Sequence, residues 1–167
     1  RYFQVIDASP LPESSITQSS AGGSLVFLHN AANTDESNRA EVNAYLHANK
    51  VRDFVLQHHP GFPIIATQTV FPIEVQFAGT CNAFYLGNRM RFYASGGGCR
   101  NSAFSTIVYH EYGHHVVYCA GSGQGAYGEG FGDSLAAVMT DESRLGVGFN
   151  ACTAASPETT HASVTGF

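Results

Sequence analysis

The chain has 167 residues, a size that suits one domain or two small subdomains packed around a cleft. Its formal net charge is −5, and its acidic and basic residues are scattered without a basic cluster, which argues against a nucleic-acid partner. A hydrophobic content of 44% is enough for a core, and no apolar run approaches the roughly 20 residues of a membrane span, which argues against a membrane-embedded protein.

The first elements along the chain are irregular and then helical. Residues 1–24 are rich in serine and proline, and we expect them to form an extended arm that wraps the domain. The apolar run at residues 25–28 predicts a strand or a docked extended piece. Apolar residues at helical spacing then predict a helix that begins near Asn33 and ends near His59, before Pro60-Gly61.

The middle of the chain has the pattern of a small sheet. Alternating apolar and polar residues within 64–78 predict a strand. Segments 82–86 and 89–93 flank Gly87-Asn88, a dipeptide typical of a tight hairpin, and a glycine-rich loop at 96–98 follows. The order of a helix, a small antiparallel sheet and further helices predicts an α+β fold, with the sheet stacked above the next helix.

That next helix, predicted over residues 102–118 with Ser102 as a candidate cap, carries the sequence His110-Glu111-Tyr112-Gly113-His114. Residues four apart share one face of a helix, so the two imidazoles can bind one ion. Zinc accepts imidazole and carboxylate ligands, and a catalytic zinc keeps one position for water. Glu111 is the candidate general base beside that position.

A second helix is expected from Glu129 to about Met139. Glu129 and Asp133 are four residues apart, so both would face the first helix. Glu129 is the candidate third zinc ligand, and Asp133 could accept a hydrogen bond from a ligand imidazole and fix its tautomer. The spacing of these residues predicts a zinc hydrolase, and a metallopeptidase first among them.

The four cysteines allow three disulfide pairings: Cys81, Cys99, Cys119 and Cys152. If 102–118 is helical, about 25 Å of helix separates Cys99 from Cys119. A disulfide needs α-carbons within about 7 Å, so that pair is excluded. Of the two pairings left, Cys81–Cys99 with Cys119–Cys152 is the more local. A composition rich in Gly, Ser, Asn and Thr, with a single lysine, favours a secreted protein over a cytosolic one with free thiols.

Several segments together resemble the gluzincin metallopeptidases, typified by the thermolysin and fungalysin families. The two metal-site motifs, HEYGH at 110–114 and GEGFGD at 128–133, are similar to theirs. The segment Asn82-Ala83-Phe84-Tyr85 resembles their edge strand, and residues 43–54 resemble the helix that precedes their sheet. The resemblance covers roughly residues 40–140.

The resemblance implies a zincin-like fold with one catalytic zinc. Its motifs assign roles to five residues: zinc ligands His110, His114 and Glu129, general base Glu111, and Asp133 as the partner of a ligand histidine. It also implies that Asn82 and Ala83 hold an extended peptide along an open strand edge. Calcium sites are common in these families, but the scattered acids here read as solvated charges and do not indicate one.

The chain departs from the family pattern in two places. The connection between His114 and Glu129 is shorter than in the relatives. The lower subdomain, which in the family supplies a histidine or tyrosine that stabilises the oxyanion, is short or truncated here, and His161 and Tyr127 are the candidate donors. The expected organisation is an arm over 1–24, an upper α+β subdomain over 25–118 and a lower subdomain over 119–167, with a missing C-terminal segment or pro-segment left open.

The predicted function is zinc-dependent endopeptidase activity on a peptide or protein substrate. The alternative is a zinc-stabilised, catalytically inactive fragment or binding domain of a gluzincin. A structural zinc usually has protein ligands at all four positions, whereas a catalytic zinc keeps one open. Water or a side chain such as His161 in the fourth position would therefore discriminate the two.

Overall fold

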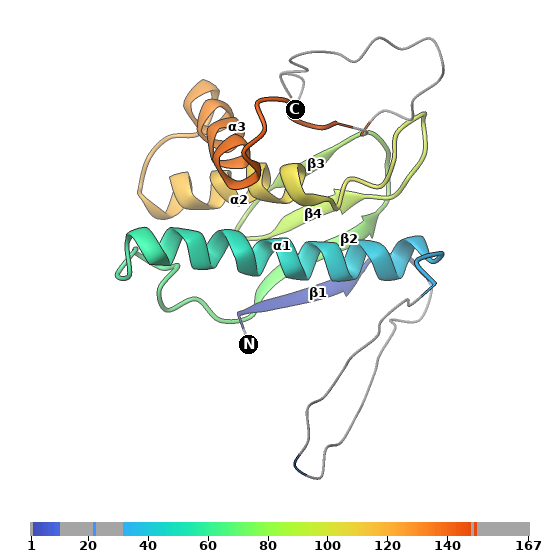
Figure 1. The fold of residues 1–167 in the computed structure, drawn as a ribbon, viewed down its shortest axis with the longest axis horizontal. Coiled ribbons are helices and arrows are strands. Elements are labelled where there is room, and N and C mark those ends of the chain that lie inside the picture. The colour runs from blue at the N-terminus through green and yellow to red at the C-terminus, as the bar shows by residue number, and fades with distance from the viewer. Residues whose placement is uncertain (1, 11–21, 23–31, 148, 150–167) are drawn as a thin grey trace.

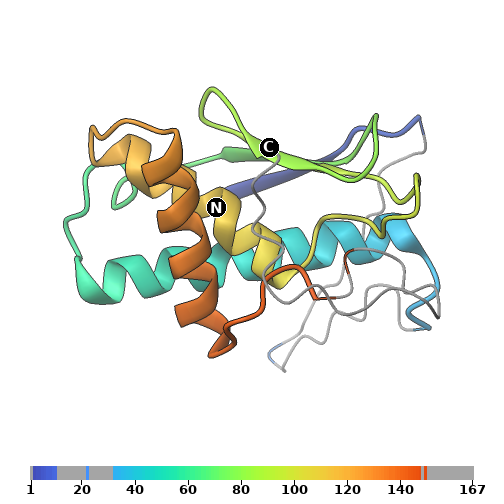
Figure 2. The same cartoon turned by 90° about the horizontal axis from the view of Figure 1, so that it is seen from above.

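The computed structural model describes residues 2–10, 22, 32–147 and 149. The run at 25–28, Cys152 and His161 lie outside the described residues. Helices α1 and α2 lie on one side of a four-stranded sheet, and α3 packs on α2 (Figure 1 and Figure 2). No helix in the described part is both long and apolar enough to cross a membrane. The elements in chain order are β1 (Phe3–Asp7), α1 (Glu36–His58), β2 (Phe71–Phe77), β3 (Ala83–Tyr85), β4 (Met90–Tyr93), α2 (Ser105–Cys119) and α3 (Ala126–Thr140).

Helix α1 confirms the helix predicted between Asn33 and His59, with a later start. Its N-cap is Asp35, whose Oδ1 accepts the backbone N–H of Asn38 at 2.8 Å. Asn33 stands before the cap with a φ of 52°, outside the helical region. The buried face of α1 consists largely of small residues at helical spacing, which let the helix lie close to the sheet: Ala40, Ala44, Ala48, Val51 and Val55.

The sheet is mixed, which corrects the prediction of an antiparallel one. Its strand order is β1-β2-β4-β3; β1 pairs parallel with β2, β2 pairs parallel with β4, and β3 pairs antiparallel with β4. Helix α1 is the crossover that returns the chain for the parallel β1–β2 pair. Alternation of apolar and polar residues reports which face of a strand is buried and carries no information on strand direction, so the sequence pattern could not distinguish the two cases.

The N-terminal residues 3–7 belong to the sheet and are not part of a wrapping arm, which corrects the expectation for this part of 1–24. Phe3 is fully buried, and its ring contacts those of Phe71 and Tyr112 at centroid distances of 5.9 and 6.1 Å. Burying such a side chain stabilises the fold by about 1.5–3 kcal/mol. Strand β1 therefore contributes a buried side chain to the core between the sheet and α2.

The hairpin formed by β3 and β4 is confirmed. The backbone N–H of Leu86 donates to the carbonyl of Arg89 at 3.0 Å. Gly87 and Asn88 between them both have positive φ, 57° and 64°, as a two-residue type I′ turn requires. Among the described strands, β3 is the last in the sheet and pairs only with β4, so its other side is an open edge.

One of the two expected disulfides is present. Cys81 is bonded to Cys99 with a Cα–Cα distance of 5.2 Å, and this bond ties the start of the hairpin to the glycine-rich loop before α2. Cys119 is a buried free thiol at the end of α2. The pairing Cys119–Cys152 is therefore not supported, and Cys152 lies outside the described residues.

Helices α2 and α3 confirm the two predicted helices with shifted ends. Ser102 is not the cap of α2, because the N-cap is Phe104; Ser102 is buried, and its Oγ accepts the backbone N–H of Tyr93 at 2.7 Å. The two helices approach closely at a pair of glycines: a Cβ added to Gly113 would lie 2.7 Å from the Cα of Gly132. This contact sets the distance between the two sequence motifs.

Candidate metal centre

His110 and His114 lie one turn apart on the buried part of α2, as their spacing predicts. Their Nε2 atoms are 3.2 Å apart. A Cβ on Gly132 of α3 would lie 2.9 Å from the His110 Nδ1, so this glycine lets the backbone of α3 lie directly against the imidazole. The close contact of α2 and α3 thus brings the second motif up to the two histidines.

Glu129 completes a group of three ligand atoms. Its Oε2 lies 3.2 Å from His110 Nε2, and its Oε1 lies 3.5 Å from His114 Nε2. Tetrahedral zinc with ligand bonds of about 2.0–2.1 Å places two ligand atoms about 3.3 Å apart. Glu129 Oε2 is moreover buried and has no hydrogen-bond partner in the described structure. Both observations fit a divalent cation such as zinc, which would satisfy all three groups at once.

The outward-facing nitrogen of each imidazole has its own acceptor. His110 Nδ1 lies 2.9 Å from Asp133 Oδ1, the contact expected from sequence, and His114 Nδ1 lies 2.9 Å from Gln124 Oε1. Burial lowers the pKa of His110 and the neighbouring His114 lowers it further, while Asp133 and Glu129 act in the opposite direction. The net shift is downward and favours the neutral imidazole that a metal needs.

Glu111 lies beside the group and is almost fully buried, with 2% of its surface exposed. In the metal-free chain burial raises the pKa of Glu111, the nearby charge of Glu129 raises it further, and a backbone hydrogen bond from Tyr85 acts against both, leaving a value of about 8. A buried carboxyl group with a backbone donor from the neighbouring strand has a restricted position.

A cavity of about 220 Å³ opens at these residues. One wall is strand β3, and the other comes from α2, α3 and the segment between them. Of the predicted pair, Ala83 lines this cavity and Asn82 does not. The Asn82 Oδ1 accepts the backbone N–H of Ala83 at 2.8 Å. The lining residues are Ala83, Phe84, Tyr85, Glu111, His114, Gln124 and Glu129.

The candidate oxyanion donors are not among these residues. Tyr127 is 60% exposed on α3 and is absent from the cavity lining, and His161 lies outside the described residues. Tyr112 is fully buried, and its ring packs against those of Phe3 and His115. The described residues thus bring together the candidate metal ligands and Glu111, and Tyr127 does not join them.

Sequence reasoning missed two residues near the group. Gln124 has no motif to mark it, and only the fold of the segment after α2 returns it to His114. His115 is buried, and burial lowers its pKa to about 4; its Nδ1 lies 3.2 Å from the Tyr85 hydroxyl and its Nε2 lies 3.3 Å from Gln68 Oε1. The only sequence signal for His115 was that a histidine stands at a position where the apolar pattern of the helix predicts a buried residue.

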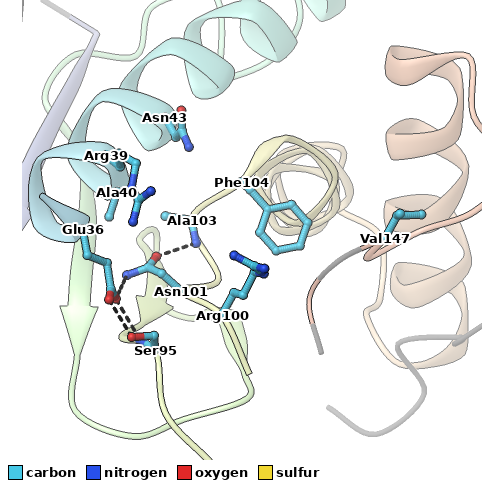
Figure 3. A pocket seen from close by; sticks show the side chains of 10 residues that line it. All are labelled: Glu36, Arg39, Ala40, Asn43, Ser95, Arg100, Asn101, Ala103, Phe104 and Val147. Carbon is cyan, nitrogen blue, oxygen red and sulfur yellow. Dashed lines mark hydrogen bonds between the residues drawn. The ribbon is translucent and has the colours of Figure 1, made fainter. Parts of the chain in front are cut away.

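A larger cavity among the described residues lies elsewhere. It measures about 650 Å³ and lies between α1 and the loop that precedes α2 (Figure 3). Its carboxylate, Glu36, is already bound by the backbone and hydroxyl of Ser95 and by the side chain of Asn101. None of its lining residues belongs to the His-His-Glu group.

These features define the class of fold. A small mixed sheet above a buried helix, with a third helix packed on it, is an α+β fold of the zincin-like type. The group on α2 and α3 is of the kind that binds zinc.

A solved structure supports this class. The chain is similar to the precursor of protealysin, a metalloproteinase from Serratia proteamaculans, with a TM-score of 0.57 and 19% sequence identity over 83% of this chain. At that identity the likeness shows the fold alone. The matched region is 43% of the neighbour, so this chain spans less than half of that protein's length. No protein-family profile and no curated protein matches the chain.

Proposed function

We propose that this chain is the zinc-binding, catalytic part of a metalloendopeptidase of the gluzincin type, related to the thermolysin and fungalysin families. One observation carries the proposal. Three ligand atoms at separations suited to tetrahedral zinc lie next to the buried carboxyl group of Glu111, at a cavity walled by an open strand edge. A structural metal site has no use for that carboxyl group.

In this proposal His110, His114 and Glu129 hold the zinc. A zinc held there would lower the pKa of a water molecule and polarise a substrate carbonyl. His114, Glu129 and Glu111 all line the cavity, so water and substrate in the cavity would lie next to the ligand group. Asp133 orients His110 through its Nδ1.

Glu111 acts as the general base and then as the general acid. It takes a proton from the attacking water and passes it to the leaving amine. The backbone hydrogen bond from Tyr85 restricts the carboxyl group at the wall of the cavity, between the strand and the ligand group. This arrangement suits proton transfer within the cavity, since few other positions are open to the side chain.

The substrate is an extended peptide that pairs with the open edge of β3. Ala83 lies on that strand at the cavity, so its backbone groups are near the reacting bond. Asn82 would contribute by turning its amide from the Ala83 N–H towards the peptide. For the oxyanion donor we retain His161; Tyr127, exposed and away from the cavity lining, suits that role less.

The Cys81–Cys99 disulfide supports a secreted protein, because such bonds persist mainly in oxidising compartments. A second candidate function is a zinc-stabilised domain without catalysis. It is favoured by the position of Tyr127, one of the two candidate oxyanion donors, which is exposed and does not line the cavity.

The test is cleavage of a mixed peptide library by the zinc-loaded 167-residue chain and by Glu111→Gln. We expect cleavage by the wild type and a loss of roughly 10²–10⁴-fold in the variant, with equal zinc content, since a general acid-base group contributes about that much. Equal cleavage by the two proteins would contradict the role of Glu111. Stoichiometric zinc without any cleavage would favour the binding domain.

A further inference from the structure

The Nδ1 atoms of the two histidines in the candidate metal centre contact different chemical groups. His110 faces the carboxylate of Asp133, whereas His114 faces the side-chain amide of Gln124. Gln124 comes from the segment between α2 and α3 and makes two contacts with the same residue. Its Oε1 lies 2.9 Å from His114 Nδ1, and its Nε2 donates to the His114 backbone carbonyl at 3.0 Å.

These two contacts together determine the tautomer of His114. A backbone carbonyl can only accept, so the amide end that faces it must be the NH₂ group of Gln124. The other end of the amide, the Oε1, can only accept, so His114 Nδ1 must carry the proton. His114 Nε2 is then the unprotonated nitrogen, and it is the nitrogen that points at His110 and Glu129.

The contact to the backbone carbonyl is not explained by helix capping. Helix α2 ends at Cys119, so its unpaired carbonyls belong to its last four residues. Backbone donors of residues 120–122 already reach three of these carbonyls, those of Val116, Val117 and Tyr118. The His114 carbonyl lies further inside the helix, so the Gln124 amide does not supply a hydrogen-bond donor to any of the unpaired carbonyls at the helix end.

Gly128 leaves the space in which the amide lies. A Cβ at this position would be 2.5 Å from Gln124 Oε1, closer than real Cβ atoms come, and 3.0 Å from His114 Nδ1, tighter than most real Cβ contacts. Gly128 directly precedes the ligand Glu129 in the first turn of α3. The amide of this exposed residue therefore lies between one ligand's imidazole and the turn that carries another ligand.

We propose that Gln124, through the space left by Gly128, is a positioning residue of the metal centre that fixes the tautomer and orientation of His114. The inference rests on the proposed function, because it requires that His110, His114 and Glu129 bind zinc. It predicts that removal of the amide lowers the affinity for zinc and frees His114 to take the other tautomer, without removing any ligand atom.

The first test compares the zinc affinity of the full chain and of Gln124→Met in a chelator competition. Methionine keeps the length of the side chain but lacks both hydrogen-bonding groups. We expect affinity to fall by roughly 10–100-fold, the usual effect of removing an outer partner of a metal ligand. Ser122→Ala, an exposed change in the same segment, is the matched control and should bind as the wild type does.

Two further measurements separate this role from a merely structural one. In the metal-free chain, ring-nitrogen chemical shifts should show His114 protonated at Nδ1 in the wild type and as a mixture of tautomers in Gln124→Met. Gly128→Ala should also lower zinc affinity although Gln124 is retained, because the amide loses its space. Its additional effect in a Gln124→Met background should be smaller.

Wild-type zinc affinity in Gln124→Met, or an Nε2-protonated His114 in the wild type, would overturn the inference. A wild-type chain that binds no zinc would instead overturn the proposed function. The two failures are therefore distinguishable in one experiment.

Discussion

Two of the cavities lined by the described residues differ in whether their carboxylates already have hydrogen-bond donors. In the larger cavity Glu36 accepts from the Ser95 backbone at 2.9 Å, the Ser95 hydroxyl at 2.5 Å and Asn101 at 3.0 Å. In the smaller cavity Glu129 keeps a buried oxygen without a hydrogen-bond donor among the described residues. A satisfied carboxylate holds elements of the fold together, whereas an unsatisfied one among converging imidazoles is suited to a ligand.

The comparison teaches that size is a poor guide to the reactive site here. The cavity of about 650 Å³ has the greater volume, yet its charged group is already used to tie α1 to the loop before α2 (Figure 3). The cavity of about 220 Å³ has the three ligand atoms and Glu111. The following predictions are arranged to separate the two regions, beginning with the largest effect.

Matched carboxylate-to-amide changes should separate the cavities most clearly. Glu129→Gln should lower zinc affinity by more than about 100-fold, because even outer partners of metal ligands are worth roughly 10–100-fold. Glu36→Gln should leave zinc affinity unchanged, since Glu36 lies in the other cavity. Chelator competition measures both. Equal affinity of Glu129→Gln and the wild type would remove Glu129 from the ligand set.

The disulfide should stabilise the part of the chain near the larger cavity. Replacing both Cys81 and Cys99 by alanine opens a loop with a sequence separation of 18, which should lower the free energy of unfolding by about 3 kcal/mol. Urea unfolding measures the change. Reductant should destabilise the wild type and Cys119→Ala but not the double variant. A double variant as stable as the wild type would contradict the prediction.

Glu36→Gln should lower the stability of the fold although it leaves the affinity for zinc unchanged. The change removes the charge from three hydrogen bonds that join α1 to the loop before α2, and we expect a loss of about 1–2 kcal/mol. The urea midpoint at neutral pH is the measurement. An unchanged midpoint would mean that these hydrogen bonds are replaced without cost by the amide.

The same glutamate should affect the dependence of stability on pH, the smallest effect of the series. Burial raises the pKa of Glu36, but hydrogen bonds from Ser95 and Asn101 outweigh burial and leave the pKa below its ordinary value of 4.5. A carboxyl group with a lowered folded-state pKa stabilises the fold above its unfolded pKa, and that contribution is lost as the pH falls through the folded value.

Unfolding free energies measured from neutral pH to below pH 4.5 should therefore fall more steeply for the wild type than for Glu36→Gln. Other carboxyl groups with lowered pKa values, such as Glu74, are common to both proteins and cancel in the difference. Parallel curves for the two proteins would show that Glu36 contributes no pH-dependent stability.

Much of the fold could be predicted because the signals are local. The existence and the end of α1, the turn at Gly87-Asn88 and the helices of both motifs depend on neighbours a few residues away. The parallel pairing of β1 could not be predicted, because its partner lies more than sixty residues along the chain and strand patterns do not encode direction. The place of residues 3–7 in the sheet was missed for the same reason.

For the candidate site, the sequence by itself determined which side chains share a helix face: His110 with His114, and Glu129 with Asp133. Only the tertiary structure decided that Gly113 and Gly132 bring these faces together, that Glu111 is buried, and that Gln124 returns to His114. Helical periodicity follows from backbone geometry within a few residues. Close approach of separate elements depends on packing between distant parts of the chain, which no local pattern contains.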